Sequence, residues 1–169
     1  MLIDWTYFTK GSRHILNNAV GTVPNAQATA VLETVNAFID EYQEEFLVRM
    51  LGEVIGNKVH TYLVCLDEDE DASHTETFDA MCNHLRDSFA DYVFYQFLGT
   101  TNTQSTVTGI VRMKNANTPV SPLRRQVRAW NSMVNRNRIF AEWSKSSKCK
   151  VSGIKVSESM LTKINSLNL

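Results

Sequence analysis

Apolar side chains recur at intervals of three and four residues in three long stretches of the chain, which is the pattern of amphipathic helices. The first stretch is 25–51, where acidic residues occupy the face opposite the apolar one and Gly52 provides a natural end. The second is 75–98, whose closing segment FADYVFYQFL is apolar on nearly all sides and therefore predicts a central helix. A shorter helix is predicted between them, at residues 57–66.

The third stretch, residues 121–143, begins with Ser121 and Pro122, which suit the cap and the first position of a helix. Its predicted buried stripe consists of Leu123, Val127, Trp130, Val134 and Ala141. A polar and largely basic stripe lies beside it and consists of Arg124, Arg128, Asn131, Asn135 and Arg138.

The remaining segments have weaker patterns. Residues 2–8 alternate loosely and predict a short strand or an extended arm. Residues 100–120 are polar, with a β-prone run at 107–113 followed by turn residues, and predict a small hairpin or a protruding loop. The last 26 residues, 144–169, predict a flexible basic link with a short strand at 154–156 and a short helix from Ser157.

These elements predict a mostly α fold, namely a compact helical bundle of four to five helices with a protruding loop or small β-hairpin and extended termini. We expect one domain, residues 1–169, with no internal repeat. Its parts are an N-terminal arm (1–24), an acidic helical core (25–99), the protruding loop (100–120), a basic helix (121–143) and a C-terminal tail (144–169). The predicted core includes Phe38, Phe46, Phe89, Phe97, Val127 and Trp130.

The charges divide sharply between the two parts of the chain, although the net charge is only −1. Residues 1–99 hold 5 Lys+Arg and 16 Asp+Glu, a net charge of −11, whereas residues 100–169 hold 12 Lys+Arg and 2 Asp+Glu, a net charge of +10. The two parts can pair within one fold, or the acidic part of one copy can pair with the basic part of the next. The second arrangement is a head-to-tail contact, which closes into a ring if the rotation permits.

Composition excludes several classes of protein. With 43% hydrophobic and 21% charged residues the chain is typical of a globular protein and not of a disordered one. The start MLIDWTYFTK lacks the basic and apolar regions of a signal peptide, and no apolar run approaches the roughly 18 residues that span a bilayer. We therefore expect no membrane association. Three cysteines, Cys65, Cys82 and Cys149, are an odd number without close pairing and indicate a reducing compartment.

Signals of catalysis or metal binding are nearly absent, so we expect no enzyme, no cofactor and no metal site. Phosphate-binding, dinucleotide-binding, zinc-protease and serine-hydrolase motifs do not occur. The acidic run DEDED alternates like a calcium loop, but Ala72 and Phe78 occupy the positions that need glycine and an acidic ligand. Cys65 and Cys82 lie on apolar helical stripes and are predicted as small core residues, while Cys149 lies in the basic segment KCK.

The segment SPLRRQVRAWNSMVNRNR holds five arginines and is the main candidate for a functional surface. Its basic face could meet a protein, the backbone of a nucleic acid, or solvent alone. We favour a protein, because arginine is preferred in ion pairs at interfaces and no nucleic-acid-binding motif accompanies the basic face. The candidate interface residues are Arg124, Arg125, Arg128, Arg138, Glu41, Glu44, Glu45, Asp67, Asp69 and Asp71, with Arg112 and Lys114 as candidate loop contacts.

Four segments, in order, carry a resemblance to a known family: FIDEYQEEFLVRMLGEVIG, FADYVFYQFL, TQSTVTGIVRMKNANTPVS and RRQVRAWNSMV. Over residues 39–134 the chain resembles the head-to-tail connector (adaptor) proteins of tailed bacteriophages, specifically the neck ring proteins of crAss-like phages. The N-terminal aromatic arm and the basic C-terminal tail are less typical of that family.

The resemblance implies a structural virion protein, made in the cytoplasm of the bacterial host and located in the virion neck. It also implies a mostly helical subunit of four or five helices with a protruding loop. About twelve copies would form a ring between the portal protein and other neck or tail proteins, with the C-terminal segment reaching towards the portal. Genomic double-stranded DNA would pass through the channel without sequence-specific binding.

This resemblance bears on the arginines, since a channel that releases DNA is poorly served by a wall that binds phosphates. It predicts that Arg124, Arg128 and Arg138 face a neighbouring subunit or the portal. The alternative is a nucleic-acid-binding protein that uses Arg124, Arg125 and Arg128 on phosphates.

Overall fold

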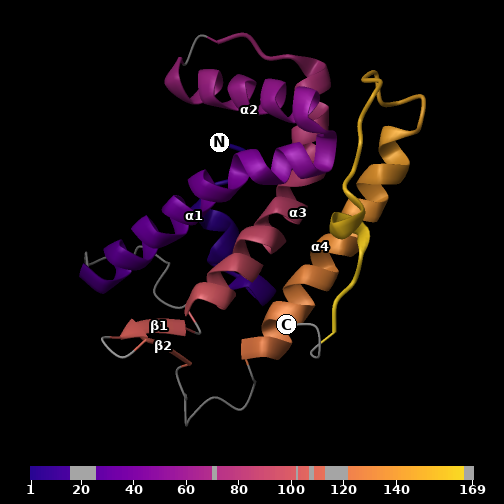
Figure 1. The fold of residues 1–169 in the computed structure, drawn as a ribbon. Helices are drawn as coiled ribbons and strands as arrows, with labels where there is room; N and C mark the ends of the chain where they lie inside the picture. The colour runs from indigo at the N-terminus through magenta and orange to yellow at the C-terminus, as the bar shows by residue number, and fades with distance from the viewer. Residues whose placement is uncertain (16–25, 70–71, 102, 107–108, 113–121, 166–169) are drawn as a thin grey trace.

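The chain is mostly helical. The computed structural model describes residues 1–15, 26–69, 72–101, 103–106, 109–112 and 122–165. Within them the α-helices are α1 (Ala26–Leu51), α2 (Glu53–Glu68), α3 (Glu76–Thr101) and α4 (Pro122–Ser144), labelled in Figure 1. Helices α1, α3 and α4 follow their predicted ranges closely. Helix α2 is longer than predicted, because it begins directly after Gly52, whose positive φ of 84° turns the chain sharply out of α1.

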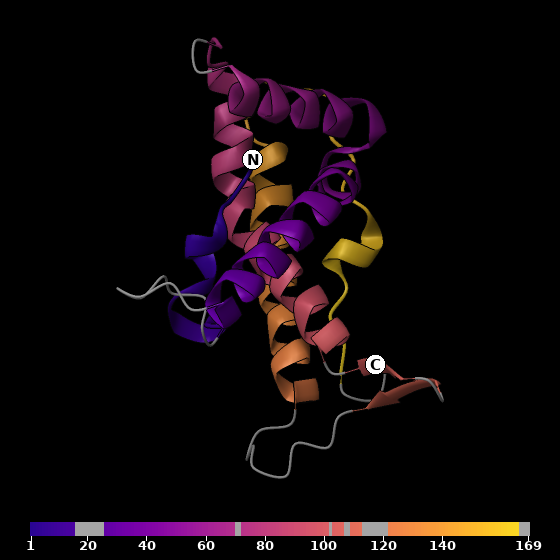
Figure 2. The same cartoon turned by 90° about the vertical axis from the view of Figure 1, so that its left-hand side faces the viewer.

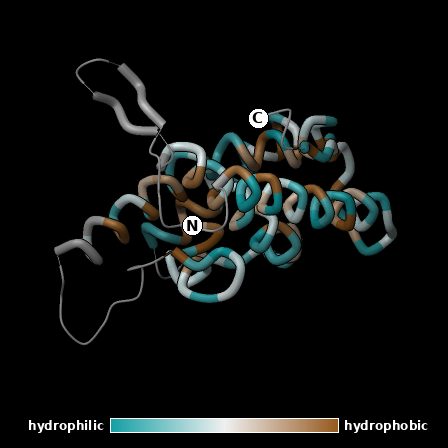
Figure 3. Tube along the Cα trace, turned by 90° about the horizontal axis from the view of Figure 1, so that it is seen from below, coloured by the Kyte–Doolittle hydropathy of each residue, from teal (hydrophilic) through white to brown (hydrophobic). Residues whose placement is uncertain are grey.

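Helix α3 forms the centre of the bundle. It packs along α4 more extensively than any other pair of helices pack, and α1 crosses it from the other side (Figures 1 and 2). Helix α2 folds back over the end of α1. Helices α1 and α4 therefore lie on opposite sides of α3. Figure 3, a view from below, shows that hydrophobic and hydrophilic residues alternate along the helices.

The core lies where α1, α3 and α4 meet. Phe46 and Phe89 are completely buried and their rings lie 5.1 Å apart. Phe38, Phe97 and Trp130, also predicted as core residues, are only partly buried and pack against its edge. Val127 was also predicted as a core residue, but its side chain is only partly buried and does not belong to the core cluster. Other side chains of α4 face α3 instead, as described below.

The N-terminal segment is folded onto the bundle, which corrects the prediction of an extended arm for residues 2–8. It forms two short 3-10 helices, Trp5–Phe8 and Gly11–Arg13. Leu2, Ile3, Phe8 and Ile15 are buried, and the backbone N–H of Leu2 donates to Oε1 of buried Gln43 at 2.6 Å. The sequence pattern was loose because only these few positions face the core.

Two short strands, β1 (Thr103–Thr106) and β2 (Gly109–Arg112), pair antiparallel with Thr103 opposite Arg112. The rest of the predicted loop, 113–121, lies outside the described residues. In the C-terminal part, residues 154–156 form no strand, and the predicted short helix is a single 3-10 turn, Glu158–Leu161. This part runs back along α4 (Figure 1).

Candidate protein interface

The side of α4 that faces α3 differs from the predicted stripe. The buried residues of α4 are Ala129, Met133, Val134, Asn137 and Phe140. Asn137 is fully buried because its hydrogen bonds are satisfied: it accepts one from the Ser88 hydroxyl, and its Nδ2 donates to the Met160 carbonyl at 2.9 Å. A stripe chosen by hydrophobicity alone leaves out this asparagine, so the predicted face was rotated about the helix axis.

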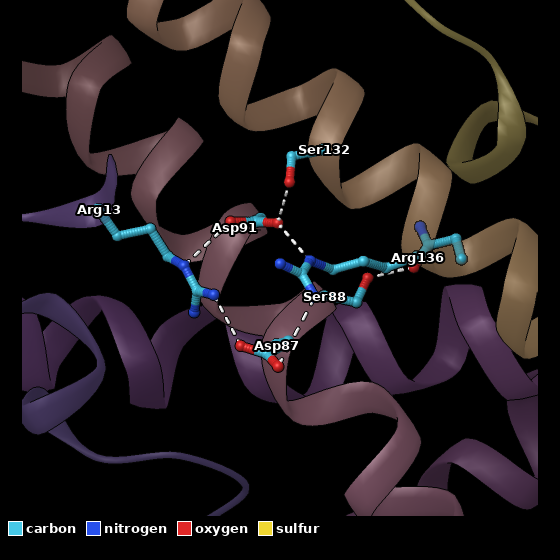
Figure 4. Close-up of polar contacts among 7 residues, drawn as sticks. Arg13, Asp87, Ser88, Asp91, Ser132 and Arg136 are labelled. Atoms are coloured by element: carbon cyan, nitrogen blue, oxygen red, sulfur yellow. Dashed lines mark hydrogen bonds and ion pairs between the residues drawn. The ribbon is translucent and has the colours of Figure 1, made fainter. Parts of the chain in front are cut away.

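A network of charges joins α3, α4 and the N-terminal segment (Figure 4). Asp91 of α3 accepts from Arg13 Nε at 3.1 Å, from Arg136 Nε at 3.0 Å and from the Ser132 hydroxyl at 2.7 Å. Asp87, one turn earlier, contacts Arg13 Nη2 at 2.6 Å and Arg136 Nη1 at 3.6 Å. Each of the two carboxylates thus contacts both guanidiniums, that of Arg13 from the N-terminal segment and that of Arg136 from α4.

The two carboxylates of this network have different environments. Asp91 is 3% exposed, and its burial raises the pKa of the carboxyl although two arginines and Ser132 act in the other direction. The hydrogen bond from Arg13 lowers the pKa of the more exposed Asp87. Asp91 is therefore a buried charge that depends on its partners, and Asp87 is a supporting surface charge.

None of these residues is among the interface residues predicted from the sequence, although Arg136 lies in the five-arginine segment. One signal was available, because Asp91 is the single charged residue in FADYVFYQFL, and a carboxylate in an apolar segment needs a basic partner. Arg136 is that partner from the basic helix. Some charges of the acidic part, residues 1–99, are thus paired with charges of the basic part, residues 100–169, within the same chain.

Two of the four predicted interface arginines have hydrogen-bond partners within the chain. Arg125 Nη2 donates to the His14 carbonyl at 3.2 Å, and its guanidinium carbon lies 5.2 Å from the centre of the Phe94 ring. Arg138 Nε and Nη2 both donate to the Leu161 carbonyl, at 3.1 and 2.8 Å. These two side chains therefore hold the N-terminal segment and the C-terminal part in place.

The other two arginines, Arg124 and Arg128, are exposed and one helical turn apart. Neither forms a hydrogen bond or an ion pair with any residue that the structure describes. They form the available part of the predicted basic surface.

The acidic candidates of α1 likewise include side chains with and without an ion-pair partner in the described part of the chain. Glu41, Glu44 and Glu45 are exposed on α1, but Glu45 Oε1 accepts from Arg49 Nη1 at 2.9 Å and from the Tyr92 hydroxyl at 3.1 Å. Glu41 and Glu44 form no ion pair with a described cation.

The remaining candidates belong to α2 and the loops. Asp67 pairs with the N-terminal ammonium of Met1, and Asp69 is the exposed C-cap of α2. Asp71 and Lys114 lie outside the described residues, and Arg112 ends β2, with its backbone alone described.

The three thiols differ in accessibility, and Cys65 is exposed and not a core residue as predicted. Burial raises the pKa of the Cys82 thiol to about 11, so about one molecule in a thousand carries its thiolate at pH 8. We expect an aromatic disulfide reagent at pH 8 to label Cys65 fast, half-buried Cys149 more slowly, and Cys82 only through unfolding. Peptide mass mapping against time measures the order. Equal rates at all three cysteines would contradict the packing of Cys82 in α3.

No family model matches this chain, and neither a curated protein nor a solved structure matches it. Among the described residues, no three His, Cys, Asp or Glu side chains gather in a way that could hold a metal ion. None of the helices in the described part of the chain has the length and apolar character needed to cross a membrane.

Proposed function

We propose that this chain is a structural, non-enzymatic protein of a bacteriophage neck, a head-to-tail adaptor. About twelve copies form a ring between the portal protein and other neck or tail proteins, and double-stranded DNA passes through the ring without sequence-specific binding. The hairpin and the loop that follows it, with Arg112 and Lys114, protrude and contact these other proteins. The chain needs no cofactor for this role.

The observation that carries the proposal is that charges without an ion-pair partner among the described residues lie on two different sides of the chain. Arg124 and Arg128 are exposed on α4, Glu41 and Glu44 are exposed on α1, and these helices lie on opposite sides of α3. A ring with head-to-tail contacts needs two different complementary faces, one for each neighbour. The pattern resemblance in residues 39–134 points to the same kind of assembly.

Nucleic-acid binding is the second candidate function, because Arg124 and Arg128 are available to phosphates. The third residue of that hypothesis, Arg125, already contacts the His14 carbonyl and the Phe94 ring. Two cations in each copy release few counterions, so we expect no binding of duplex DNA at physiological salt. Tight binding that weakens steeply with salt would favour the second function.

Charge reversal tests which faces meet. We expect the double variant Arg124→Glu/Arg128→Glu to lose self-association, because it places carboxylates against Glu41 and Glu44 of the next copy. The reversal of both faces, with Glu41→Lys/Glu44→Lys added, restores association. The matched control, Lys58→Glu/Arg86→Glu, changes the net charge equally at exposed positions and leaves association intact. Analytical ultracentrifugation measures each variant, and failure of the fourfold variant to reassociate rules out this pair of faces.

A further inference from the structure

The side chains of α4 that contact residues 157–165, here called the groove, bind mostly backbone atoms. Arg49 of α1 adds two contacts to the same segment, because its carbonyl accepts from the Ser157 N–H at 2.8 Å and its Nη2 donates to the Ser159 hydroxyl at 3.1 Å. Trp130 Nε1 donates to the Thr162 carbonyl at 2.9 Å. Asn131 makes a pair of hydrogen bonds with the backbone of Ile164, donating to its carbonyl at 2.9 Å and accepting from its N–H at 3.0 Å. Asn137 and Arg138 hold the carbonyls of Met160 and Leu161 as described above.

One side chain anchors this segment, residues 157–165. Met160 is fully buried, whereas Leu161 and Ile164 are half-buried and Thr162 and Lys163 are exposed. Hydrogen bonds to the main chain together with an apolar anchor are features by which proteins bind short peptide segments, and here the anchor Met160 lies in the 3-10 turn Glu158–Leu161. The groove therefore has the properties of a peptide-binding site that the chain's own segment occupies.

The connection between α4 and this segment, residues 145–156, is held mainly by partly buried side chains, since Val151, Ile154 and Val156 pack against the core and exposed Lys150 pairs with Glu76 at 3.4 Å. Towards α1 it is attached through the N–H of Lys155, which donates to the Leu51 carbonyl at 3.3 Å. Gly153 has a positive φ of 87° and no atom within 4 Å of the place that a Cβ would occupy. A cavity of about 350 Å³ lies between the connection and α4, lined by Ala141, Lys145, Ile154 and Leu161 among others. The groove supplies the side-chain hydrogen bonds that position the segment, whereas the connection contributes a few apolar contacts and one surface ion pair.

We propose that the groove also takes segment 157–165 from a second copy of this chain, so that two copies are linked by exchange of their C-terminal segments. The twelve residues of the connection span up to ~40 Å when extended, which exceeds the ~35 Å length of α4. The segment of one copy can therefore reach the groove of another. This inference is independent of the neck assignment.

The intact chain favours its own segment, because a short tether gives that segment an effective concentration on the order of millimolar. Exchange of segments becomes measurable when one copy has a defective groove and the other copy has a defective segment. Asn131→Ala removes the two hydrogen bonds to Ile164 and leaves the segment intact, whereas Met160→Ala removes the anchor and leaves the groove intact. A mixture of these two full-length variants contains a complete groove and a complete segment only on different copies.

Fluorescence energy transfer between the two labelled variants measures their association. We expect the mixture to associate at least tenfold more tightly than either variant with itself. The control replaces Asn131→Ala by Asn135→Ala, an exposed position one turn further along the same face of α4. In that control the segment stays in its own intact groove, so association is weaker, whereas ring formation through Arg124 and Arg128 would be equal in both mixtures.

Equal association in the two mixtures, with all variants folded by circular dichroism, would overturn the exchange of segments. If Met160→Ala does not fold, Ile164→Ala takes its place, because this half-buried side chain belongs to the same segment. The neck proposal is tested by a different experiment, which measures the association of the unchanged chain.

Discussion

Replacing Gly56 by alanine is expected to lower the free energy of unfolding by about 2–3 kcal/mol. A Cβ at this position of α2 would lie 2.6 Å from the Val48 Cα, 2.7 Å from the Val48 N and 2.8 Å from the Leu47 carbonyl oxygen. All three are backbone atoms of α1, which cannot rotate away, so α2 has to separate from α1. The gain in helix propensity, about 1 kcal/mol, offsets only part of that loss. Urea unfolding followed by circular dichroism measures the effect.

Gly99→Ala in α3 is the matched control, since it also replaces a helical glycine. The close neighbour of its added Cβ is the Gln126 Nε2 at 2.8 Å, the far end of a flexible side chain. We expect this variant to be as stable as the unchanged chain or more stable by up to about 1 kcal/mol. A Gly56→Ala variant as stable as Gly99→Ala would contradict the close approach of α1 and α2.

The second large effect is expected for Asp91→Ala, with a loss of about 3 kcal/mol or more in the free energy of unfolding. The substitution leaves Arg13 with Asp87 as its remaining carboxylate partner among the described residues, and the Arg13 side chain is only 14% exposed. It also removes the acceptor of the Ser132 hydroxyl and of Arg136 Nε. Because a buried charge without its partner retains its desolvation cost, the attachment of the N-terminal segment to α3 is weakened to the pair of Arg13 with Asp87 and the apolar contacts. Chemical unfolding and proteolysis near residues 1–15 measure the two consequences.

Asp87→Ala provides the comparison on the same face of α3. Its carboxylate is 55% exposed, and such surface pairs contribute about 1 kcal/mol or less. We therefore expect Asp87→Ala to retain the attached N-terminal segment. Equal effects of the two substitutions would mean that Asp91 has no special role.

Helices were the part of the fold that the sequence could predict well. Long amphipathic patterns define α1, α3 and α4, because each helix buries a continuous stripe, and Gly52 and Pro122 mark the end of α1 and the start of α4. The start of α2 was missed, since Gly52 both ends one helix and directly precedes the next. The folded N-terminal segment was also missed, because its four buried side chains follow no regular period.

The candidate interface was predictable only in outline. The division of charge showed that the chain has complementary surfaces, but not which arginines are already used. Arg125 and Arg138 bind backbone carbonyls of segments that are distant in sequence, so their partners depend on how both ends of the chain fold back. Arg136 is paired because Asp91 lies opposite it across the contact of α3 and α4. Helical spacing describes each helix alone and contains no such information.

Native mass spectrometry of the purified full-length chain tests the central claim most directly. We expect a closed oligomer that forms as concentration rises, near twelve times 19.2 kDa, about 230 kDa, and that is absent from the Arg124→Glu/Arg128→Glu variant. A monomer of 19.2 kDa at every concentration, for the unchanged chain and the variant alike, would contradict the account.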